Sequence, residues 1–350
     1  MIIIIGAGLS GLLTGFRLKQ KNIPFKILEA RNRIGGRIHT VYGKDNTAME
    51  MGATWFTDQH IHLKKLLEEL DIDYFKQHMD NTVFYQASAS SPTQIVQIPG
   101  QSPSYRIAGG SSKLINTLFE KLDRSDVLLN QSVTKIEVGE TTTKVHAEKI
   151  YEGTKVVLAL PPKLWAKNIS FQPTLPTDLM DIAEATHTWM EDSIKVALSY
   201  DQPFWEEENI PGTLFSNAGP VTEFYDHCNL EKSKYALCGF INSSFKNLSP
   251  IERRKAVMNQ IKNAFGPRTE EFTDYKECLW SNEKNTFESS EDFILPHQNN
   301  GHPIFSKTFF DDKLFISGSE SAARFPGYMD GAVFSGNIIF EKIIRAINSI

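Results

Sequence analysis

The first 29 residues carry the clearest pattern of apolar and polar positions in the chain. Four consecutive isoleucines, Ile2 to Ile5, lead into a glycine-containing turn, which is followed by a helical segment and by a second apolar run that ends at Glu29. An uninterrupted apolar run bounded by turn residues is typical of a buried strand. The pattern therefore predicts a strand, a turn, a helix and a second strand.

Six later stretches alternate between apolar and polar residues, which is the period of a strand. They lie at 133–138, 143–149, 155–160, 193–200, 221–225 and 235–241. Apolar spacing predicts helices at 61–70, 114–122 and 250–265, and a last helix at the C-terminus. In the stretch 193–200 the apolar residues share one face and Lys195 lies on the other, so the pattern alone directs Lys195 to solvent.

The length of 350 residues suggests two domains, on the usual scale of about 100–200 residues per domain. The chain has 37 Lys and Arg against 42 Asp and Glu, a formal net charge of −5, and no long basic block interrupts it. This balance gives no reason to expect nucleic acid as a partner, so we expect a small-molecule ligand.

Several further features bear on location and on metals. Residues 1–5 lack a charged flank and a cleavage site, so we interpret them as a strand rather than a signal peptide, and no apolar run is long enough to span a bilayer. The three cysteines, Cys228, Cys238 and Cys278, form no CxxC motif, which favours a reducing compartment, with the cytoplasm as default. The pair His60 and His62 has no third ligand beside it, so we interpret it as surface rather than metal site.

The glycine turn has the chemistry of a phosphate site. Gly6 permits a tight turn, Gly8 lets the backbone approach a pyrophosphate, and Gly11 lets helix and strand pack closely. The helix N-terminus adds unpaired N–H groups and a partial positive charge. Glu29 would accept hydrogen bonds from a ribose 2′-hydroxyl and would repel a 2′-phosphate. These residues predict a dinucleotide, and both FAD and NAD fit the pattern.

Two further segments have the composition of nucleotide contacts. The segment 30–37 follows the strand that carries Glu29 and combines arginines with glycines. Near the other end, 313–320 has the pattern of a strand, a glycine and an acid, and 325–336 opens the last helix with small residues that permit close backbone approach. We therefore expect both termini to build one domain and the intervening chain to supply the other.

An ordered series of motifs resembles that of the flavin-containing amine oxidases, the family of monoamine oxidase and polyamine oxidase. The motifs are GAGLSG with Glu29, RIGGR at 33–37, EMGATWF at 50–56, AGGSSKL, VVLALPP, SIKVALSYDQPFW at 193–205, and FISGSE followed by PGYMDGAVFSG. The resemblance covers most of the chain, which would be a short member of the family. Renalase is a more distant resemblance.

The resemblance implies an α/β fold with two domains. The first is a Rossmann-like FAD-binding domain, an NAD(P)-binding-like parallel sheet with a β-meander crossover, assembled from residues 1–75, 105–162 and 300–350. The second is a smaller α+β substrate-binding domain with a mixed or antiparallel sheet, made of residues 76–104 and 163–299.

The resemblance also implies an extended FAD and the residues that contact it. The glycine turn would hold the pyrophosphate, Glu29 the adenosine ribose, Val133 the adenine through its backbone, and Glu320 and Met329 the ribityl chain or pyrimidine edge. The full set is Gly6, Gly8, Leu9, Ser10, Gly11, Glu29, Ala30, Arg31, Gly36, Arg37, Gly52, Ala53, Thr54, Val133, Gly318, Glu320, Tyr328, Met329 and Ala332.

Three residues take catalytic roles by the same resemblance. Lys195 matches the lysine that holds a water at flavin N5, which reverses the solvent-facing interpretation above. Trp280 matches an aromatic residue near the flavin ring, with a plain core tryptophan as the alternative. Tyr328 matches one wall of the aromatic cage through which the amine approaches.

Two departures from the family change the expected site. Monoamine oxidases carry a cysteine that bonds to the flavin, followed by the second cage tyrosine, but the corresponding segment 285–293 has neither. We therefore expect non-covalent FAD and half of a cage, with Phe287 or Phe293 as substitutes. The helical insertion that roofs the family's cavity would fall between Gln86 and Arg106, where we predict a loop with a short hairpin near 95–98. The pocket should be more open, or covered by another subunit of a homo-oligomer.

These expectations describe an FAD-dependent, amine oxidase-like oxidoreductase. It would transfer a hydride equivalent from a C–H next to nitrogen to flavin N5 and be reoxidised by O₂ or another diffusible acceptor. Only one dinucleotide fingerprint is present, so we see no second site for NAD(P)H as a standing reductant. The alternatives are a renalase-like or desaturase-like oxidation of a non-amine, and a flavin-binding protein without turnover.

Overall fold

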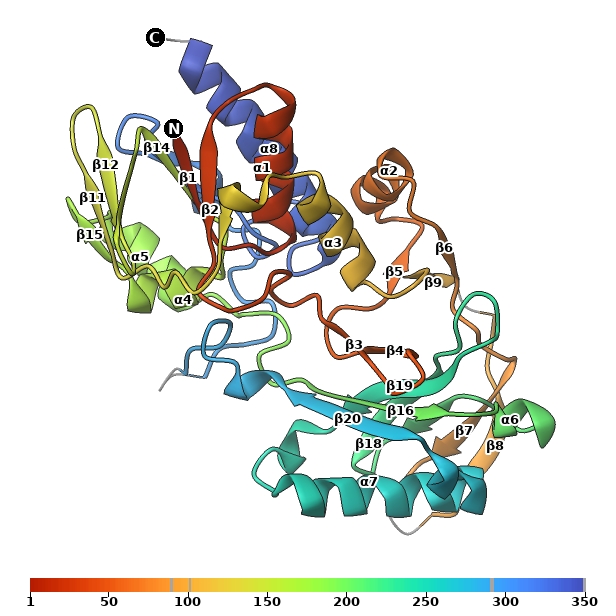
Figure 1. Cartoon of the computed structure of the whole chain (residues 1–350). Helices are drawn as coiled ribbons and strands as arrows, with labels where there is room; N and C mark the ends of the chain where they lie inside the picture. The colour runs from red at the N-terminus through yellow and green to blue at the C-terminus, as the bar shows by residue number, and fades with distance from the viewer. Residues whose placement is uncertain (89–90, 101, 290–292, 349–350) are drawn as a thin grey trace.

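The four isoleucines of β1 (Ile2–Ile5) are buried at the centre of a six-stranded sheet (Figure 1). The computed structural model describes residues 1–88, 91–100, 102–289 and 293–348. The sheet has the order β10–β2–β1–β14–β22–β21, and its neighbours are parallel except for β21 and β22. The other strands are β2 (Phe25–Leu28), β10 (Val127–Leu128), β14 (Lys155–Leu158), β21 (Thr308–Phe309) and β22 (Leu314–Ile316). With α1 (Leu9–Gln20) between β1 and β2, the predicted N-terminal order is confirmed.

Helices cover one face of this sheet and a smaller sheet covers the other. On the first face, Ile4, Leu13 and Val333 share a core to which α1, α2 (Ile61–Glu69), α3 (Ser112–Glu120) and α8 (Met329–Asn348) contribute. On the second face, Ile3 packs in one core with Val145. That layer is a four-stranded sheet of order β13–β12–β11–β15, with β11 (Lys135–Val138), β12 (Thr143–His146), β13 (Ile150–Gly153) and β15 (Ser170–Gln172).

Strand β13 is absent from the sequence prediction, which placed three strands between 133 and 160. It is an outer strand of its sheet, with Ile150 and Glu152 exposed. An edge strand with exposed residues has no apolar alternation to reveal it. The strand predicted at 143–149 therefore ends earlier, at His146. The chain then forms β13 before it enters β14.

A seven-stranded mixed sheet forms the other half of the molecule, with the order β20–β16–β19–β18–β17–β7–β8 (Figure 1). Helix α7 (Pro250–Phe265), predicted with these bounds, covers one face, where Val257 and Ile261 pack in one core with Val196 and Leu237. The loop predicted at 87–104 contributes β8, which pairs with β7. The strands are β7 (Thr82–Gln86), β8 (Gln94–Gln97), β16 (Ile194–Tyr200), β17 (Leu214–Ser216), β18 (Val221–Asp226), β19 (Tyr235–Ile241) and β20 (Asp274–Leu279).

The opposite face of β16 is covered as well. The hairpin β3 (Thr40–Tyr42) and β4 (Ala48–Glu50) packs there, and Met49 lies in one core with Ala197 and Cys238. Lys195 is two residues from Ala197, on the same face, and has no exposed surface. The solvent-facing direction that the pattern alone predicted for Lys195 is therefore wrong. Alternation separates the two faces of a strand, but it does not show what covers each face.

Residues 162–184 pack with the parallel sheet rather than with the seven-stranded sheet. This segment contains α4 (Pro162–Asn168) and α5 (Thr177–Glu184), and Trp165 and Leu179 lie in the same core as Ile3. Strand β15 also pairs with β11. Pro162 occupies the first turn of α4, where proline is favoured, so it begins a helix of the same domain. We therefore propose a domain boundary near residue 190 in place of the predicted one after 162.

The remaining elements are short. A three-stranded sheet has the order β5–β9–β6, with β5 (Phe56–Thr57), β6 (Tyr74–Lys76) and β9 (Ser104–Ile107). The helix α6 (Phe204–Glu207) follows β16, and 3₁₀ turns lie at Arg124–Asp126, Ser243–Phe245, Pro267–Glu271, Trp280–Asn282 and Pro303–Ser306. Within the described residues, we find no helix with the length and apolarity that crossing a bilayer requires.

Candidate active site

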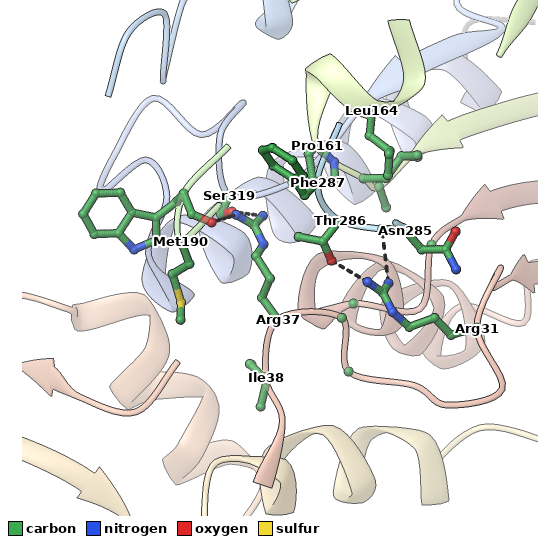
Figure 2. A pocket seen from close by; sticks show the side chains of 18 of the residues that line it. Arg31, Arg37, Ile38, Pro161, Leu164, Met190, Asn285, Thr286, Phe287 and Ser319 are labelled. Carbon is green, nitrogen blue, oxygen red and sulfur yellow. Dashed lines mark hydrogen bonds between the residues drawn. The ribbon is translucent and has the colours of Figure 1, made fainter. Parts of the chain in front are cut away.

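A cavity of about 860 Å³ is lined by residues at the carboxyl ends of β1, β2 and β14 and by Phe240 of the seven-stranded sheet. Figure 2 shows some of the side chains that line it. Ligands of open α/β sheets bind at this end of the strands. The walls come from separate parts of the chain: the N-terminal turn, the loop after β2, the segment after β4, the region around α4, and the start of α8. Every predicted cofactor residue lines the cavity except Gly11 and Glu320.

The three glycines of the N-terminal turn have different surroundings. A Cβ added to Gly8 would meet no atom within 4 Å, and Gly8 faces the cavity as the N-cap of α1. Gly6 has a φ of +106°, a conformation that favours glycine. A Cβ on Gly11 would lie 2.0 Å from the carbonyl oxygen of Gly6. Gly11 therefore permits the close packing of helix and turn, which explains why it does not reach the cavity wall.

Glu29 follows β2, and its carboxylate is held in place by backbone N–H groups. Oε2 accepts the N–H of Ala7 at 2.8 Å, and Oε1 accepts the N–H of Arg31 at 3.0 Å. An ionised carboxylate has about four acceptor positions, so it keeps capacity for the hydroxyl groups of a ribose. The glycine turn and Glu29 are thus joined by a direct hydrogen bond, at one end of the cavity.

Arg31 connects this end of the cavity to a segment more than 250 positions later. Its Nη1 donates to the carbonyl oxygen of Asn285 at 3.0 Å, and its guanidinium also binds the Glu283 carboxylate at 3.3 Å and the Thr286 hydroxyl (Figure 2). Phe287 lines the cavity, whereas Phe293 is 84% exposed. Of the two predicted aromatic substitutes, only Phe287 reaches the cavity wall, and residues 290–292 of the predicted segment lie outside the described residues.

Glu320, which the resemblance places near the ribityl chain or pyrimidine edge, is bound to Arg37 in the structure. Its buried carboxylate forms a two-pronged ion pair with Arg37, in which Nη2 lies 2.8 Å from Oε2 and Nη1 contacts Oε1. Trp189 N–H donates to Oε1 at 3.1 Å, and Arg37 Nη1 donates to the Trp189 carbonyl at 2.9 Å. Burial alone would raise the pKa of Glu320, but the Arg37 charge and hydrogen bonds hold it below its usual value. Arg37 lines the cavity, and Glu320 holds Arg37 there.

Lys195 stands directly behind the cavity wall. Its Nζ donates to the Thr54 hydroxyl at 3.1 Å and lies 4.3 Å from the ring centroid of Trp55 and 4.4 Å from that of Phe240. Thr54, Trp55 and Phe240 all line the cavity. An ammonium at this distance from two aromatic faces is attracted by their quadrupoles. The arrangement therefore brings a buried positive charge to the edge of the cavity.

Trp280 does not line the cavity and is part of the core behind it. Its side chain is fully buried, and its indole N–H donates to the carbonyl oxygen of Met51 at 2.7 Å. The place near the flavin ring that the resemblance implies stays a prediction. The plain core tryptophan, the alternative that the sequence left open, agrees with the burial of the side chain.

Tyr328 lines the cavity and belongs to an aromatic wall that the sequence did not reveal. Its ring centroid lies 5.6 Å from that of Trp189, which also lines the cavity, and Trp189 has further ring contacts with His297 at 4.4 Å and His187 at 6.2 Å. Gly327 has a φ of +87°, and a Cβ there would come within 3.2 Å of the Trp189 side chain. Trp189 lies in a segment without apolar periodicity, so only the fold identifies it as a wall residue.

His60 differs from the predicted surface position. It is buried, with its ring 4.7 Å from Phe325 and 5.4 Å from Tyr328, and burial lowers its pKa. Its neighbour His62 has a ring contact with Phe334 at 5.1 Å. In the described part of the chain, no group of three or more His, Cys, Asp or Glu side chains is arranged to hold a metal ion.

The parallel sheet has a glycine turn after its first strand, an acid after its second and a cavity at its carboxyl edge. These features define a dinucleotide-binding fold. The family model described as "Flavin containing amine oxidoreductase" matches residues 9–105 and 87–339. The chain belongs to this family. It is an FAD-dependent oxidoreductase of the amine oxidase type, as the motifs of the sequence predicted.

The similar proteins include relatives from distant organisms. The Dictyostelium discoideum protein named "Probable flavin-containing monoamine oxidase A" is 22% identical over an alignment of 452 positions. The alignment covers 98% of this chain and 97% of that protein. The flavin-containing amine oxidase B of Homo sapiens is 25% identical over 77% of this chain, and the match spans about half, 52%, of the human protein. The longer alignment with the Dictyostelium protein shows that this relative contains segments that the present chain lacks.

Solved structures show the same fold. A putrescine oxidase bound to putrescine superposes with a TM-score of 0.84 at 22% identity, covering 98% of each chain. Cyclohexylamine oxidase from Brevibacterium oxydans superposes with a TM-score of 0.85 at 18% identity, covering 99% of each chain. The predicted α/β class, with an FAD-binding part and a substrate part, is confirmed by this likeness.

Replacing Gly8 with Val should leave the protein folded but without FAD. The Cβ at this position has free space around it, so the fold is not strained, whereas a branched side chain would fill the space where the pyrophosphate approaches. Visible absorption measures bound FAD, and thermal unfolding followed by circular dichroism measures the fold. Gly100→Val is the matched control, because a Cβ there also meets nothing within 4 Å and Gly100 does not line the cavity. Full FAD content in Gly8→Val would contradict the placement.

Proposed function

We propose that the chain oxidises a monoamine whose amine-bearing carbon carries an apolar or aromatic group. The observation that carries this proposal is the aromatic end of the cavity, where Trp55, Phe240, Trp189 and Tyr328 are the walls. Flat apolar walls favour a flat or apolar substituent, because the substituent gains contact area there and gives up little hydration. Lys195, behind Thr54, supplies the one charge at this end that has no carboxylate partner within the described residues.

The distribution of acids supports a monoamine over a diamine. Among the described lining residues, the acids are Glu29 and Glu288. Glu29 is bound to the glycine turn, and Glu288 accepts a hydrogen bond from Asn168 of α4 at 3.1 Å. Neither belongs to the aromatic end, so a second ammonium group would lose its hydration there without gaining a counter-ion. Cyclohexylamine, named for one structural neighbour, fits this end better than putrescine, named for the other.

The fit of the cavity to FAD supports the roles assigned from the sequence. We propose that Gly6 and Gly8 hold the pyrophosphate, Glu29 the adenosine ribose and Val133 the adenine, while Met329 at the start of α8 faces the flavin with the positive end of that helix. Bound FAD supplies an acceptor for the hydride equivalent at N5.

We propose non-covalent binding, because none of the three cysteines lines the cavity. Acid precipitation of the protein should then release all of the FAD into the supernatant.

The chain's own residues prepare the amine. A neutral amine is the reactive form, since its lone pair assists the loss of hydride from the adjacent carbon. Aromatic walls remove water and so lower the pKa of a bound amine, and the positive charge of Lys195 acts in the same direction. The walls also fix the orientation of the C–H bond, so no strong acid or base from the protein is needed.

The cellular location and the oligomeric state are also proposals. A cytoplasmic location is supported by the three free thiols, Cys228, Cys238 and Cys278, of which two are buried. A homo-oligomer whose second copy covers the cavity is supported by the exposed apolar side chains of Phe293 and Leu295, which follow the lining segment 284–289 in sequence.

An anaerobic panel of reductants tests the proposed function. Cyclohexylamine and benzylamine should bleach the flavin absorption, and putrescine should do so at least about tenfold more slowly because burial of its second charge is uncompensated. Bleaching by a dihydropyridine or a polyene and by no amine would favour the non-amine alternative. Bleaching by none of the compounds would favour a flavin-binding protein without turnover.

Lys195→Met should retain FAD but slow the reduction of the flavin by the amine or its reoxidation. The substitution removes the charge and the bond to Thr54 while it keeps most of the apolar stem. Stopped-flow absorption measures both half-reactions. Lys155→Met is a control at a second buried lysine, whose Nζ binds the carbonyl of Asp312 outside the cavity. Unchanged rates for both half-reactions in Lys195→Met would exclude the role given to Lys195.

A further inference from the structure

A second, much smaller cavity borders Thr54. Its volume is about 30 Å³. Glu50, Thr54, Arg106 and His227 contribute polar side chains to it, and we name it the inner chamber. Thr54 lines both the inner chamber and the active-site cavity, so this threonine is the partition between the two.

Two nitrogen atoms at the inner chamber have no protein partner. These are Nδ1 of His227 and Nε of Arg106, and the two residues are only 4% and 5% exposed. Buried polar groups in folded proteins are bonded either to protein or to ordered water. A water needs about 10–15 Å³ of such a cavity, so a chamber of about 30 Å³ has room for about two waters. The unpaired nitrogens and the volume together indicate ordered water.

The other polar groups of the chamber are fixed. Glu50 accepts the backbone N–H of Ser111 and the hydroxyl of Thr40 at 3.0 Å, and the Arg106 guanidinium lies 4.7 Å from the ring centroid of Phe75. Burial, followed by the charges of Arg106 and Lys195, lowers the pKa of His227 well below its usual value. A neutral imidazole can donate a proton at one nitrogen and accept one at the other.

The chamber extends from the active site toward the surface. At one side, the Thr54 hydroxyl accepts the hydrogen bond of Lys195 Nζ at 3.1 Å and donates its own proton to the carbonyl oxygen of Gly52 at 3.0 Å, so a chamber water reaches this hydroxyl as a donor to its remaining lone pair. At the other side, the lining includes Gly109, which is exposed, and Asn229 and Lys234, which are half-buried. A file of water between these ends would connect solvent to Lys195 without crossing the aromatic walls.

We propose that the inner chamber holds ordered water bonded to His227 and Arg106, and that this water carries protons between the surface near Asn229 and the Thr54 and Lys195 pair. With O₂ as acceptor, formation of H₂O₂ takes two electrons and two protons. The hydride equivalent supplies two electrons and one proton, so the second proton comes from solvent. Each water of the file, and the neutral imidazole of His227, takes up one proton and releases one, while Arg106 only donates a hydrogen bond that holds a water in place, so no group along the file changes its net protonation. The proposal deepens the function proposed above, since it assigns that reaction its proton route.

Reoxidation after chemical reduction tests the route without any amine, so failure of the amine assignment would not affect the result. The protein, loaded with FAD, is reduced by sodium dithionite and mixed with oxygenated buffer in H₂O or D₂O. His227→Phe should slow reoxidation by about tenfold and weaken its solvent isotope effect, a smaller change than the roughly 100-fold or more of a direct proton donor. His227→Asn should restore most of the rate, because the amide offers a polar atom near the place of Nδ1.

The matched control is His62→Phe, since His62 also has a buried nitrogen without a protein partner but does not line the chamber. It should reoxidise like the wild type. Equal rates and isotope effects in His227→Phe and wild type would overturn the proton route. A high-resolution crystal structure of the unchanged protein gives a test independent of folding: water within hydrogen-bond distance of His227 Nδ1 and Arg106 Nε supports the proposal, and its absence from both atoms overturns it.

Discussion

The ion pair of Arg37 and Glu320 joins the parts of the chain that make the active site. Arg37 belongs to the N-terminal nucleotide loop, Glu320 follows the strand β22, and both bind the backbone of Trp189 in the segment that leads to the seven-stranded sheet. A buried ion pair is weak evidence for stability, since desolvation offsets the attraction. The ion pair instead fixes relative positions, because it holds the two ends of the chain and the aromatic wall in place together. Removing one partner would leave a buried charge without compensation.

Local chemistry explains which features the sequence predicts. A strand, a glycine turn, a helix and an acid lie within the first 29 residues. Each of them can be predicted from its own short stretch of sequence, without knowledge of distant contacts. The predicted cofactor residues reach one cavity because backbone positions at the ends of parallel strands converge wherever such a sheet forms. Glu320 is the informative exception. The motif predicts its place in the chain, but the direction of its carboxylate depends on Arg37, which lies 283 positions earlier.

The features that the pattern of apolar and polar residues missed or left open depend on what covers a surface. The direction of Lys195 follows from the hairpin β3 and β4 packing on its face of β16, and Trp280 turns its indole toward Met51 for the same reason. Trp189 lies in a segment with no period, and its ring is placed by the backbone bonds to Arg37 and Glu320 and by the bare backbone of Gly327. Long-range contacts of this kind leave no signal within a short window of sequence.

The position of Lys195 between an aromatic cavity and a polar chamber follows from the energetics of a buried ammonium. An ammonium has three donors, and in the described structure one of them meets the Thr54 hydroxyl while two aromatic rings face the charge. Rings alone do not replace the hydration of a cation. Polar groups behind Thr54 therefore help to stabilise the charged Lys195 close to the apolar cavity without bringing water into that cavity. In the function proposed above, the dry walls would favour the neutral amine, and the polar groups behind them would stabilise the charge that helps to keep the amine neutral.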